Sequence, residues 1–133
     1  MRGEFPFGEK RTALGILADP IIRIPILTKY GYQNFDFLVD TGADCSMMPA
    51  AAAQDLSIDL EDSSRIKFQG IGGESVSARI ARIKMKIIEE PIAVTCAFAA
   101  RENTPFILGR KDIFSKFSLT FDNSRKRIRF TPI

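Results

Sequence analysis

The residues best suited to chemistry in this sequence are a carboxylate and the two residues after it, Asp40-Thr41-Gly42. The carboxylate follows residues 35–39, a nearly continuous apolar run of the kind that forms a buried strand. A side chain at the end of such a strand is held rigidly in a cleft. Glycine has no Cβ, so another backbone can approach closely at Gly42. The tripeptide is also compatible with an ordinary turn, so by itself it does not define a catalytic site.

The sequence contains no histidine. Its absence excludes Ser-His and Cys-His nucleophilic catalysis and the zinc hydrolases whose metal is bound by histidine. An enzyme of this composition that works near neutral pH must use carboxylates as its acid and base, or less readily Lys, Tyr or Cys. Cys45 lies close to Asp40 in the sequence, but it has no histidine to activate it. We therefore interpret Cys45, like Cys96 in its apolar strand, as a small packing residue.

The composition is that of one ordinary globular domain. Hydrophobic residues make up 45% of the 133 residues and charged residues 26%. The net charge of +3 is mild, and much of it comes from the basic run at residues 125–129. Such a run usually lies on a solvated strand or turn, so we predict no nucleic-acid partner. A nucleic-acid-binding β-barrel remains an alternative, and it would bind in a strongly salt-dependent way.

Two cysteines are too few for a disulfide framework or for a cysteine metal cluster, so no metal or other cofactor is expected. The N-terminal segment is charged and lacks the apolar core of a signal peptide. No stretch approaches the roughly 20 apolar residues of a transmembrane helix. These features predict a cytoplasmic protein without membrane contact.

Many short segments rich in β-branched and aromatic residues alternate with turn residues, which predicts a mainly β, barrel-like domain. The predicted strands cover residues 21–27, 35–39, 65–69, 75–80, 83–88, 92–99, 106–108, 118–121 and 127–130. Residues 1–18 show no committed pattern and are expected to form a lead-in to a single domain over residues 19–133.

Two short helices are expected between the strands. Residues 49–56 form the first, with a proline tolerated in its first turn. Residues 111–117 form the second, and the spacing of Ile113, Phe114 and Phe117 predicts that all three pack inward.

Gly70-Ile71-Gly72-Gly73 separates two alternating segments, which predicts a hairpin with a glycine-rich tip. The tip is not a phosphate-binding loop, because no Gly-Lys-Ser/Thr follows it and a strand comes next instead of a helix. An ordinary hairpin turn remains an alternative.

Residues 37–44, which read Phe-Leu-Val-Asp-Thr-Gly-Ala-Asp, resemble the active-site signature of aspartic proteases, and the Ala43-Asp44 continuation resembles the retropepsin branch. The glycine-rich tip and Ile107-Leu108-Gly109-Arg110 occur in the order and approximate spacing of that family. The resemblance covers about residues 20–130. Residues 49–56 and 109–114 look more like prokaryotic retropepsin-like proteins than viral enzymes. The resemblance implies a single-lobe acid-protease fold, a closed β-barrel with one or two short helices.

The resemblance also implies roles for the residues of the signature. Asp40 would be the catalytic carboxylate, and Thr41, Gly42 and Ala43 would support the active-site loop. In the family, the threonine side chain bonds the backbone of the symmetry-related loop.

Further roles follow from the other two motifs. Asp44 and Arg110 would form a largely buried ion pair that braces the loop; the alternative is a helix-capping Asp and a surface Arg. Gly70, Ile71, Gly72 and Gly73 would form a flap that presents backbone groups to a bound peptide. Side chains that would line or support the substrate pockets are Leu38, Ile71 and Ile107.

Aspartic-protease chemistry needs two carboxylates that share one proton, whereas this sequence has one Asp-Thr-Gly. The two-lobed members of the class need over twice this length. The resemblance therefore implies a homodimer with two Asp40 carboxylates on a two-fold axis, acting as an aspartic endopeptidase on extended peptides. The alternative is a retropepsin-fold module that binds peptides or dimerises without turnover. Viral members interleave their terminal strands; the long lead-in and Pro132 weaken such pairing here.

Overall fold

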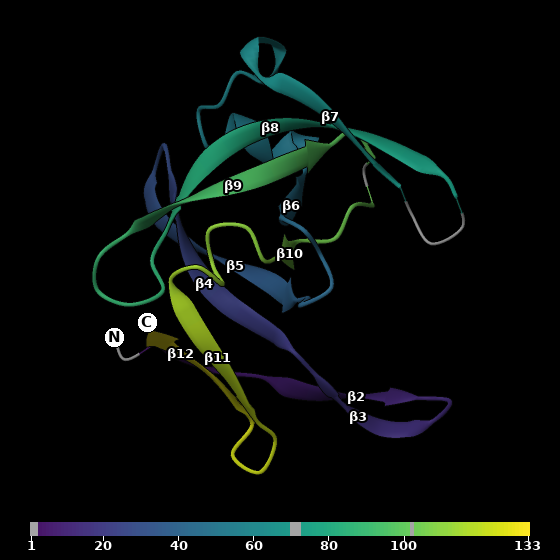
Figure 1. The fold of residues 1–133 in the computed structure, drawn as a ribbon, viewed down its shortest axis with the longest axis vertical. Helices are drawn as coiled ribbons and strands as arrows, with labels where there is room; N and C mark the ends of the chain where they lie inside the picture. The colour runs from purple at the N-terminus through teal and green to yellow at the C-terminus, as the bar shows by residue number, and fades with distance from the viewer. Residues whose placement is uncertain (1–2, 70–72, 102) are drawn as a thin grey trace.

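The computed structural model describes residues 3–69, 73–101 and 103–133 (Figure 1), and it confirms the prediction of a mainly β fold. The strands are β1 (Glu4–Pro6), β2 (Gly8–Thr12), β3 (Gly15–Asp19), β4 (Ile21–Thr28), β5 (Gly31–Val39), β6 (Ser46–Pro49), β7 (Ser64–Gln69), β8 (Ser75–Met85), β9 (Ile92–Ala99), β10 (Ile107–Leu108), β11 (Phe117–Asp122) and β12 (Arg127–Pro132). Two 3-10 helices are also described, η1 (Ala50–Gln54) and η2 (Leu60–Asp62).

The largest sheet has the strand order β4-β5-β10-β6-β9-β8-β7. An additional pairing of β4 with β8, at Ile26 and Met85, closes this sheet into a ring, and β7 is attached to the outside of β8. The ring encloses the main core. Along β4, Ile22, Ile24 and Ile26 are fully buried while the residues between them are more exposed, as the period of two in a strand requires. Each fully buried side chain of this size contributes roughly 1.5–3 kcal/mol to stability.

A second, smaller sheet brings the two ends of the chain together in the order β1-β12-β11 (Figure 1). Phe130 of β12 makes edge-to-face contacts with Phe5 of β1, at 5.5 Å between ring centroids, and with Phe117 of β11, at 5.9 Å. The expectation that residues 1–18 lack committed structure is therefore wrong. Phe5 and Phe7 are both buried, and this pair of aromatic residues was the signal for a folded segment.

The rest of the N-terminal segment forms a hairpin of β2 and β3 that pairs with itself, from Gly8 opposite Asp19 to Thr12 opposite Gly15. Figure 1 shows it projecting from the body of the molecule. Neither helical segment in the part of the chain that the structure describes has the length and apolar character needed to cross a membrane.

The two predicted helices have different outcomes. The first is present as the short 3-10 helix η1, which buries Ala53. The second is wrong, because residues 111–116 form consecutive turns. Asp112 has a φ of 68°, which a continuous α-helix does not allow, and its carboxylate accepts a hydrogen bond from the Thr95 N–H. As a result, Ile113 and Phe117 are buried as predicted, whereas Phe114 remains 38% exposed.

The predicted strand at residues 75–80 and the first part of the one at 83–88 form one strand, β8, which ends at Met85. Ala81 and Arg82, which lie between the two predicted strands, pair with Cys96 and Thr95 of β9 and continue the ladder. β8 pairs with β9 from Ala78 onward, so its residues 75–77 pair only with β7, in the hairpin that was predicted to form the flap.

Candidate active site

The position of Asp40 follows from the order of strands in the large sheet. β10 lies between β5 and β6, parallel to the first and antiparallel to the second. The chain therefore leaves β5, crosses over the end of β10 in the loop at residues 40–45, and enters β6. Asp40 is the first residue beyond β5, and its N–H donates to the Leu108 carbonyl of β10 at 3.0 Å. The backbone that carries a catalytic carboxylate at this position is therefore held by a hydrogen bond to the neighbouring strand.

Gly109 lies where the loop crosses β10. A Cβ at this position would be 2.9 Å from the Cys45 Cα and closer still to the Cys45 carbonyl, so only glycine fits. The Gly109 N–H donates to the Ser46 hydroxyl at 3.1 Å, and Ser46 is fully buried. From the sequence, Gly109 was identified only as part of a motif, and Ser46 was not identified as a site residue. A polar residue at the start of the apolar Met47-Met48 strand was the available signal.

The Asp40 side chain is half-buried and held by its own loop. Its Oδ1 accepts a hydrogen bond from the Gly42 N–H at 2.9 Å, and its carbonyl accepts from the Ala43 N–H at 3.2 Å. A Cβ on Gly42 would lie 3.3 Å from the same carboxylate oxygen. Thr41 is exposed at the apex. The loop thus fixes one oxygen of a carboxylate at the surface, where a water or a second carboxylate can reach it.

Arg110 and Asp44 form the predicted ion pair, with Nη2 and Oδ1 2.6 Å apart. The expectation that the pair is largely buried is wrong, because the two side chains are 47% and 79% exposed. The loop is braced by backbone instead. The N–H groups of Arg110 and Lys111 donate to the carbonyls of Ala43 and Asp44, at 3.0 and 2.9 Å.

Because the pair is exposed, Arg110→Ala and Asp44→Ala should each reduce the free energy of unfolding by less than about 1 kcal/mol. Urea melts of both single variants and of the double variant measure this and give the coupling between the two residues. The exposed pair Arg23–Asp36, at 3.2 Å, is a matched control. A loss of several kcal/mol confined to the Arg110–Asp44 pair would mean that the pair is buried in the working protein.

The thiol next to this loop has the character of a packing group. Burial, assisted by the negative charge of Asp44, raises the pKa of Cys45 above its usual value, despite a hydrogen bond with the Ala97 backbone that acts in the opposite direction. Burial also raises the pKa of Cys96, which is fully enclosed. Both thiols are therefore protonated at neutral pH and are poor nucleophiles, as predicted from the absence of histidine.

Asp112 was missed by the sequence analysis, although it supports the turns that follow Arg110. Its Oδ2 accepts from the Thr95 N–H of β9 at 2.8 Å. Burial raises the pKa of Asp112, but the hydrogen bonds with Thr95 and the charges of Lys111 and Arg82 outweigh it, so the pKa is lowered overall. The charged form therefore stabilises the folded state.

Asp112→Asn should lower the stability by about 1 kcal/mol at neutral pH, because a neutral acceptor replaces a charged one and asparagine tolerates the positive φ. The contribution of the carboxylate is fully present above the pKa of the unfolded chain, near ~4, and is lost as the pH falls through the lower folded pKa. Urea midpoints of wild type and variant should therefore differ at pH 7 and converge in acid. A difference that persists unchanged below pH ~2 would contradict this role of the charge.

The predicted flap falls partly outside the described residues, which do not include Gly70, Ile71 and Gly72. Gly73, the last of the four, has a φ of 81°, which favours glycine. The strands leading to the tip pair in register up to Gln69 opposite Ser75.

The base of the hairpin packs toward the active-site loop through a small apolar cluster formed by Ala78, Ala97 and Ala99, against which Cys45 and Phe68 lie. Leu38 and Ile107, which were predicted to line or support the pockets, are half-buried neighbours on β5 and β10. A hollow of about 480 Å³ at the base of the hairpin lies between β7, β8 and η2, and none of the described site residues lines it. The site residues of one chain thus lie outside this hollow, with Thr41, Gly42 and Asp44 exposed. Among the described residues, no cluster of three or more Asp, Glu or Cys side chains could hold a metal ion.

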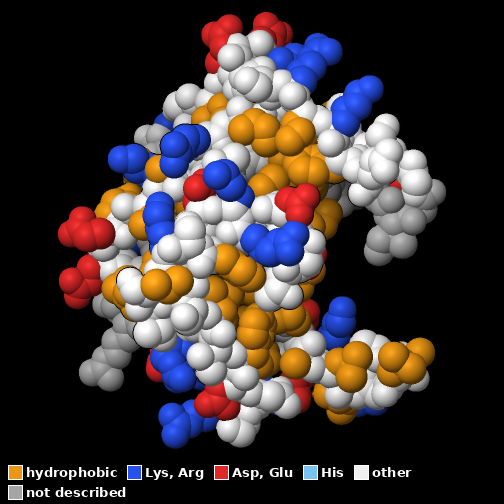
Figure 2. Space-filling model, viewed as in Figure 1, with side chains coloured by type: hydrophobic (Ala, Val, Ile, Leu, Met, Phe, Trp, Pro, Cys, Tyr) orange, Lys and Arg blue, Asp and Glu red, His pale blue; other side chains and the backbone are white. Residues whose placement is uncertain are grey.

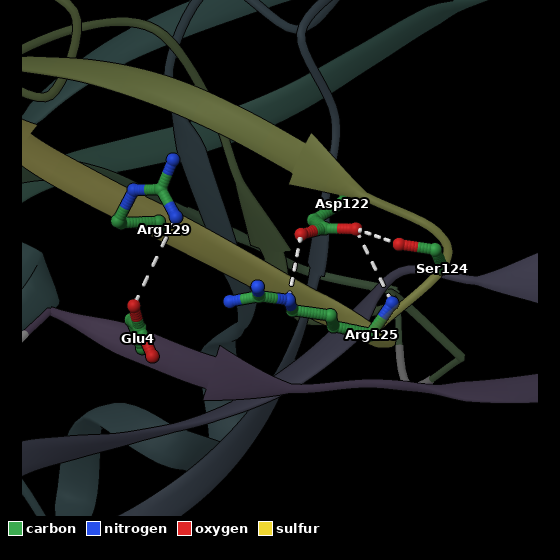
Figure 3. Close-up of polar contacts among 5 residues, drawn as sticks. All are labelled: Glu4, Asp122, Ser124, Arg125 and Arg129. Atoms are coloured by element: carbon green, nitrogen blue, oxygen red, sulfur yellow. Dashed lines mark hydrogen bonds and ion pairs between the residues drawn. The ribbon is translucent and has the colours of Figure 1, made fainter.

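The basic C-terminal run is largely neutralised by acidic partners (Figure 3). Arg125 approaches Asp122 and Arg129 approaches Glu4, each at 3.9 Å, and Ser124 donates to the same Asp122 carboxylate at 2.7 Å. The hydrogen bond from Ser124, followed by one from the Arg125 N–H at 3.2 Å, lowers the pKa of Asp122. The run therefore ties β12 to β1 and closes the β11–β12 turn, which agrees with the interpretation as a solvated strand and turn.

Comparison with known proteins identifies the family and the fold. The family model described as aspartyl protease matches residues 27–111, more than half of the chain. The fold is similar to that of a retropepsin-like aspartic protease from Rickettsia conorii, with a TM-score of 0.62, 16% identity, and coverage of 96% of this chain and 87% of that chain. It is also similar to EIAV protease complexed with the inhibitor HBY-793, with a TM-score of 0.53, 23% identity, and coverage of 69% and 82%. No curated protein sequence matches the chain.

Proposed function

The chain belongs to the aspartyl protease family, and from this premise we propose that it is an aspartic endopeptidase active as a homodimer, in which each subunit supplies one Asp40. The observation that carries the proposal is the placement of Asp40. A half-buried carboxylate stands at the end of β5, whose residues Phe37 and Val39 are buried, with one oxygen fixed by the Gly42 N–H, on a loop locked over β10. The resemblance of the fold to retropepsin-like enzymes also supports the proposal.

The proposed dimer follows from the chemistry, because one carboxylate cannot act as base and acid in the same step. Two Asp40 side chains meeting on a two-fold axis would share one proton, since like charges this close do not both ionise. The ionised carboxylate takes a proton from a water that attacks the scissile carbonyl carbon. The protonated one donates its proton to the carbonyl oxygen, which gives a tetrahedral diol and leaves the dyad with one proton.

The surrounding loop suits a symmetric contact. Thr41 and Gly42 are exposed at its apex, so in the proposed dimer the Thr41 hydroxyl bonds the backbone of the partner loop and Gly42 allows close approach. The peptide would lie extended between this floor and the two β7–β8 hairpins, with backbone bonds of the kind a strand makes. Leu38 and Ile107 beside the loop favour apolar residues next to the scissile bond. We further propose a reducing, cytoplasmic location, which the free Cys45 and Cys96 support.

Cleavage of an extended apolar peptide by the purified protein tests this proposal, measured over a range of protein concentrations. If two chains form one site, the specific activity should fall on dilution as the dimer dissociates, and the mass measured by sedimentation should fall with it. Activity that stays proportional to protein concentration while the chain is monomeric would exclude the shared dyad. Binding of the peptide by a dimer without any cleavage would favour a non-catalytic module.

A further inference from the structure

The β2–β3 hairpin is nearly all surface. Every residue from 8 to 18 except Thr12 is exposed, and the two strands form a sheet of their own. An isolated two-stranded hairpin is only marginally stable in water. This one is nevertheless well formed, because the Thr12 hydroxyl donates to the Gly15 carbonyl at 2.9 Å and accepts from the Leu14 N–H at 3.0 Å. A defined turn therefore presents an element that its own chain does not cover.

The exposed surface of this hairpin is apolar where an ordinary solvated hairpin would be polar. Leu14 at the turn is 88% exposed, and Ile16 and Leu17 on β3 are 59% and 42% exposed. The register places Leu17 opposite Lys10 and Ile16 opposite Arg11, so both faces and the tip carry an apolar side chain. Figure 2 shows hydrophobic side chains gathered over this projecting element. Large apolar side chains exposed together at the end of a projecting element indicate an interaction site.

The base of the hairpin is fixed, which sets its direction. The Phe7 N–H donates to the Lys126 carbonyl at 3.1 Å, and the Lys126 ammonium lies 3.2 Å from a Glu9 carboxylate oxygen. In the view of Figure 1 the hairpin projects on the same side as the far end of the β7–β8 hairpin, and β5 ends between them. Figure 2 shows that side of the molecule hollowed between the two projections. The side that must meet a second Asp40 is thus flanked by two arms.

The proposed dimer needs more contact than the active-site loops alone provide. A stable interface buries about 800 Å² per partner. The C-terminal strand β12 lies between β1 and β11 and is paired on both edges, so it cannot pair with a second chain. The β2–β3 hairpin on the same side offers further apolar surface that its own chain does not cover.

We propose that the β2–β3 hairpin is a dimerisation arm that packs its apolar tip, Leu14 with Ile16 and Leu17, against a second copy of this chain. The inference rests on the proposed homodimer and names the surface that holds it together. Two-fold symmetry makes every contact of the arm occur twice, so a small element contributes two patches. The aliphatic stems of Lys10 and Arg11 extend the apolar surface while their charges remain at its edge.

Sedimentation and peptide cleavage by the double variant Leu14→Glu/Ile16→Glu, over a range of concentrations, test the arm. The dissociation constant of the dimer should rise at least roughly 30-fold, the effect of losing one hot-spot side chain. Cleavage should be lost at low protein concentration and return at high concentration with unchanged kcat per dimer. Tyr30→Glu is the matched control, because Tyr30 is 68% exposed in the turn at the other end of β4 and should leave dimerisation unchanged.

A second variant tests the arm without introducing charged side chains. Deleting residues 10, 11, 16 and 17 removes two paired rungs and keeps the turn from Thr12 to Gly15, so it shortens the arm and should weaken the dimer to a similar extent. An unchanged dissociation constant in both variants would overturn the proposal that the β2–β3 hairpin is a dimerisation arm. A stable dimer with a reduced kcat/KM would also overturn it, because the hairpin would then contact substrate. A wild-type chain that cleaves nothing and stays monomeric would instead refute the proposed function itself.

Discussion

Asp40→Asn is expected to abolish peptide cleavage while the protein folds and dimerises normally. The amide has the shape of the carboxylate and can still accept the hydrogen bond from the Gly42 N–H at 2.9 Å. It cannot take a proton from the attacking water or share the proton of the dyad. Removal of a positioned proton-transfer group costs at least about 10²–10⁴-fold in rate.

The control for this variant is Asp36→Asn. It removes the charge of an exposed carboxylate on β5, which forms an ion pair with Arg23. Asp36→Asn should keep wild-type kcat/KM, and both variants should keep the wild-type melting temperature. Cleavage by pure Asp40→Asn protein at a rate near that of Asp36→Asn would show that Asp40 is not the catalytic carboxylate.

Gly109→Ala should have the largest effect on stability. The added methyl group would overlap the Cys45 backbone, and backbone cannot move aside as the end of a side chain can. The strain falls where the active-site loop crosses β10 and would disturb the hydrogen bond from Gly109 to the buried Ser46. We expect a loss of roughly 3 kcal/mol, the upper end for overpacking, with a loss of activity because Asp40 is carried by the same loop.

Gly8→Ala is the corresponding control, because no atom lies within 4 Å of a Cβ built there and its φ is not positive. Urea unfolding should show Gly8→Ala within about 0.5 kcal/mol of wild type. If Gly109→Ala unfolded at the same urea concentration as Gly8→Ala, the close crossing of the loop over β10 would be contradicted.

The parts of the fold that could be predicted are those in which neighbouring residues carry the pattern. The β-branched residues at positions 21–27 indicated a strand, and β4 covers this segment and buries Ile22, Ile24 and Ile26. The apolar run before Asp40 likewise indicated a strand that ends at the carboxylate, and β5 does end at Val39. Only Phe37 and Val39 of this strand are buried, so the expectation of a wholly buried strand was wrong. The resemblance of the signature to that of retropepsins extended the prediction from one strand to a whole fold, because the family's motifs occur here in the same order.

The parts that could not be predicted depend on residues far apart in the sequence. The spacing of Ile113, Phe114 and Phe117 suits a helix, but the bond from the Thr95 N–H to Asp112 holds a positive φ that ends it. The exposure of the Arg110–Asp44 pair depends on how the loop at residues 40–45 packs against the rest of the protein, which the residue types do not reveal. β1 was missed because three residues give no periodicity, and its partner β12 lies at the other end of the chain.

The stoichiometry of a statine-type transition-state mimic tests the central claim most directly. Such an inhibitor places its hydroxyl between two carboxylates that share a proton, so it binds tightly only where two Asp40 side chains meet. Calorimetric titration of the wild-type chain should give one inhibitor bound per two chains, with no tight binding to Asp40→Asn. One inhibitor bound per chain, or equal affinity for Asp40→Asn, would contradict an active site shared between two copies of this protein.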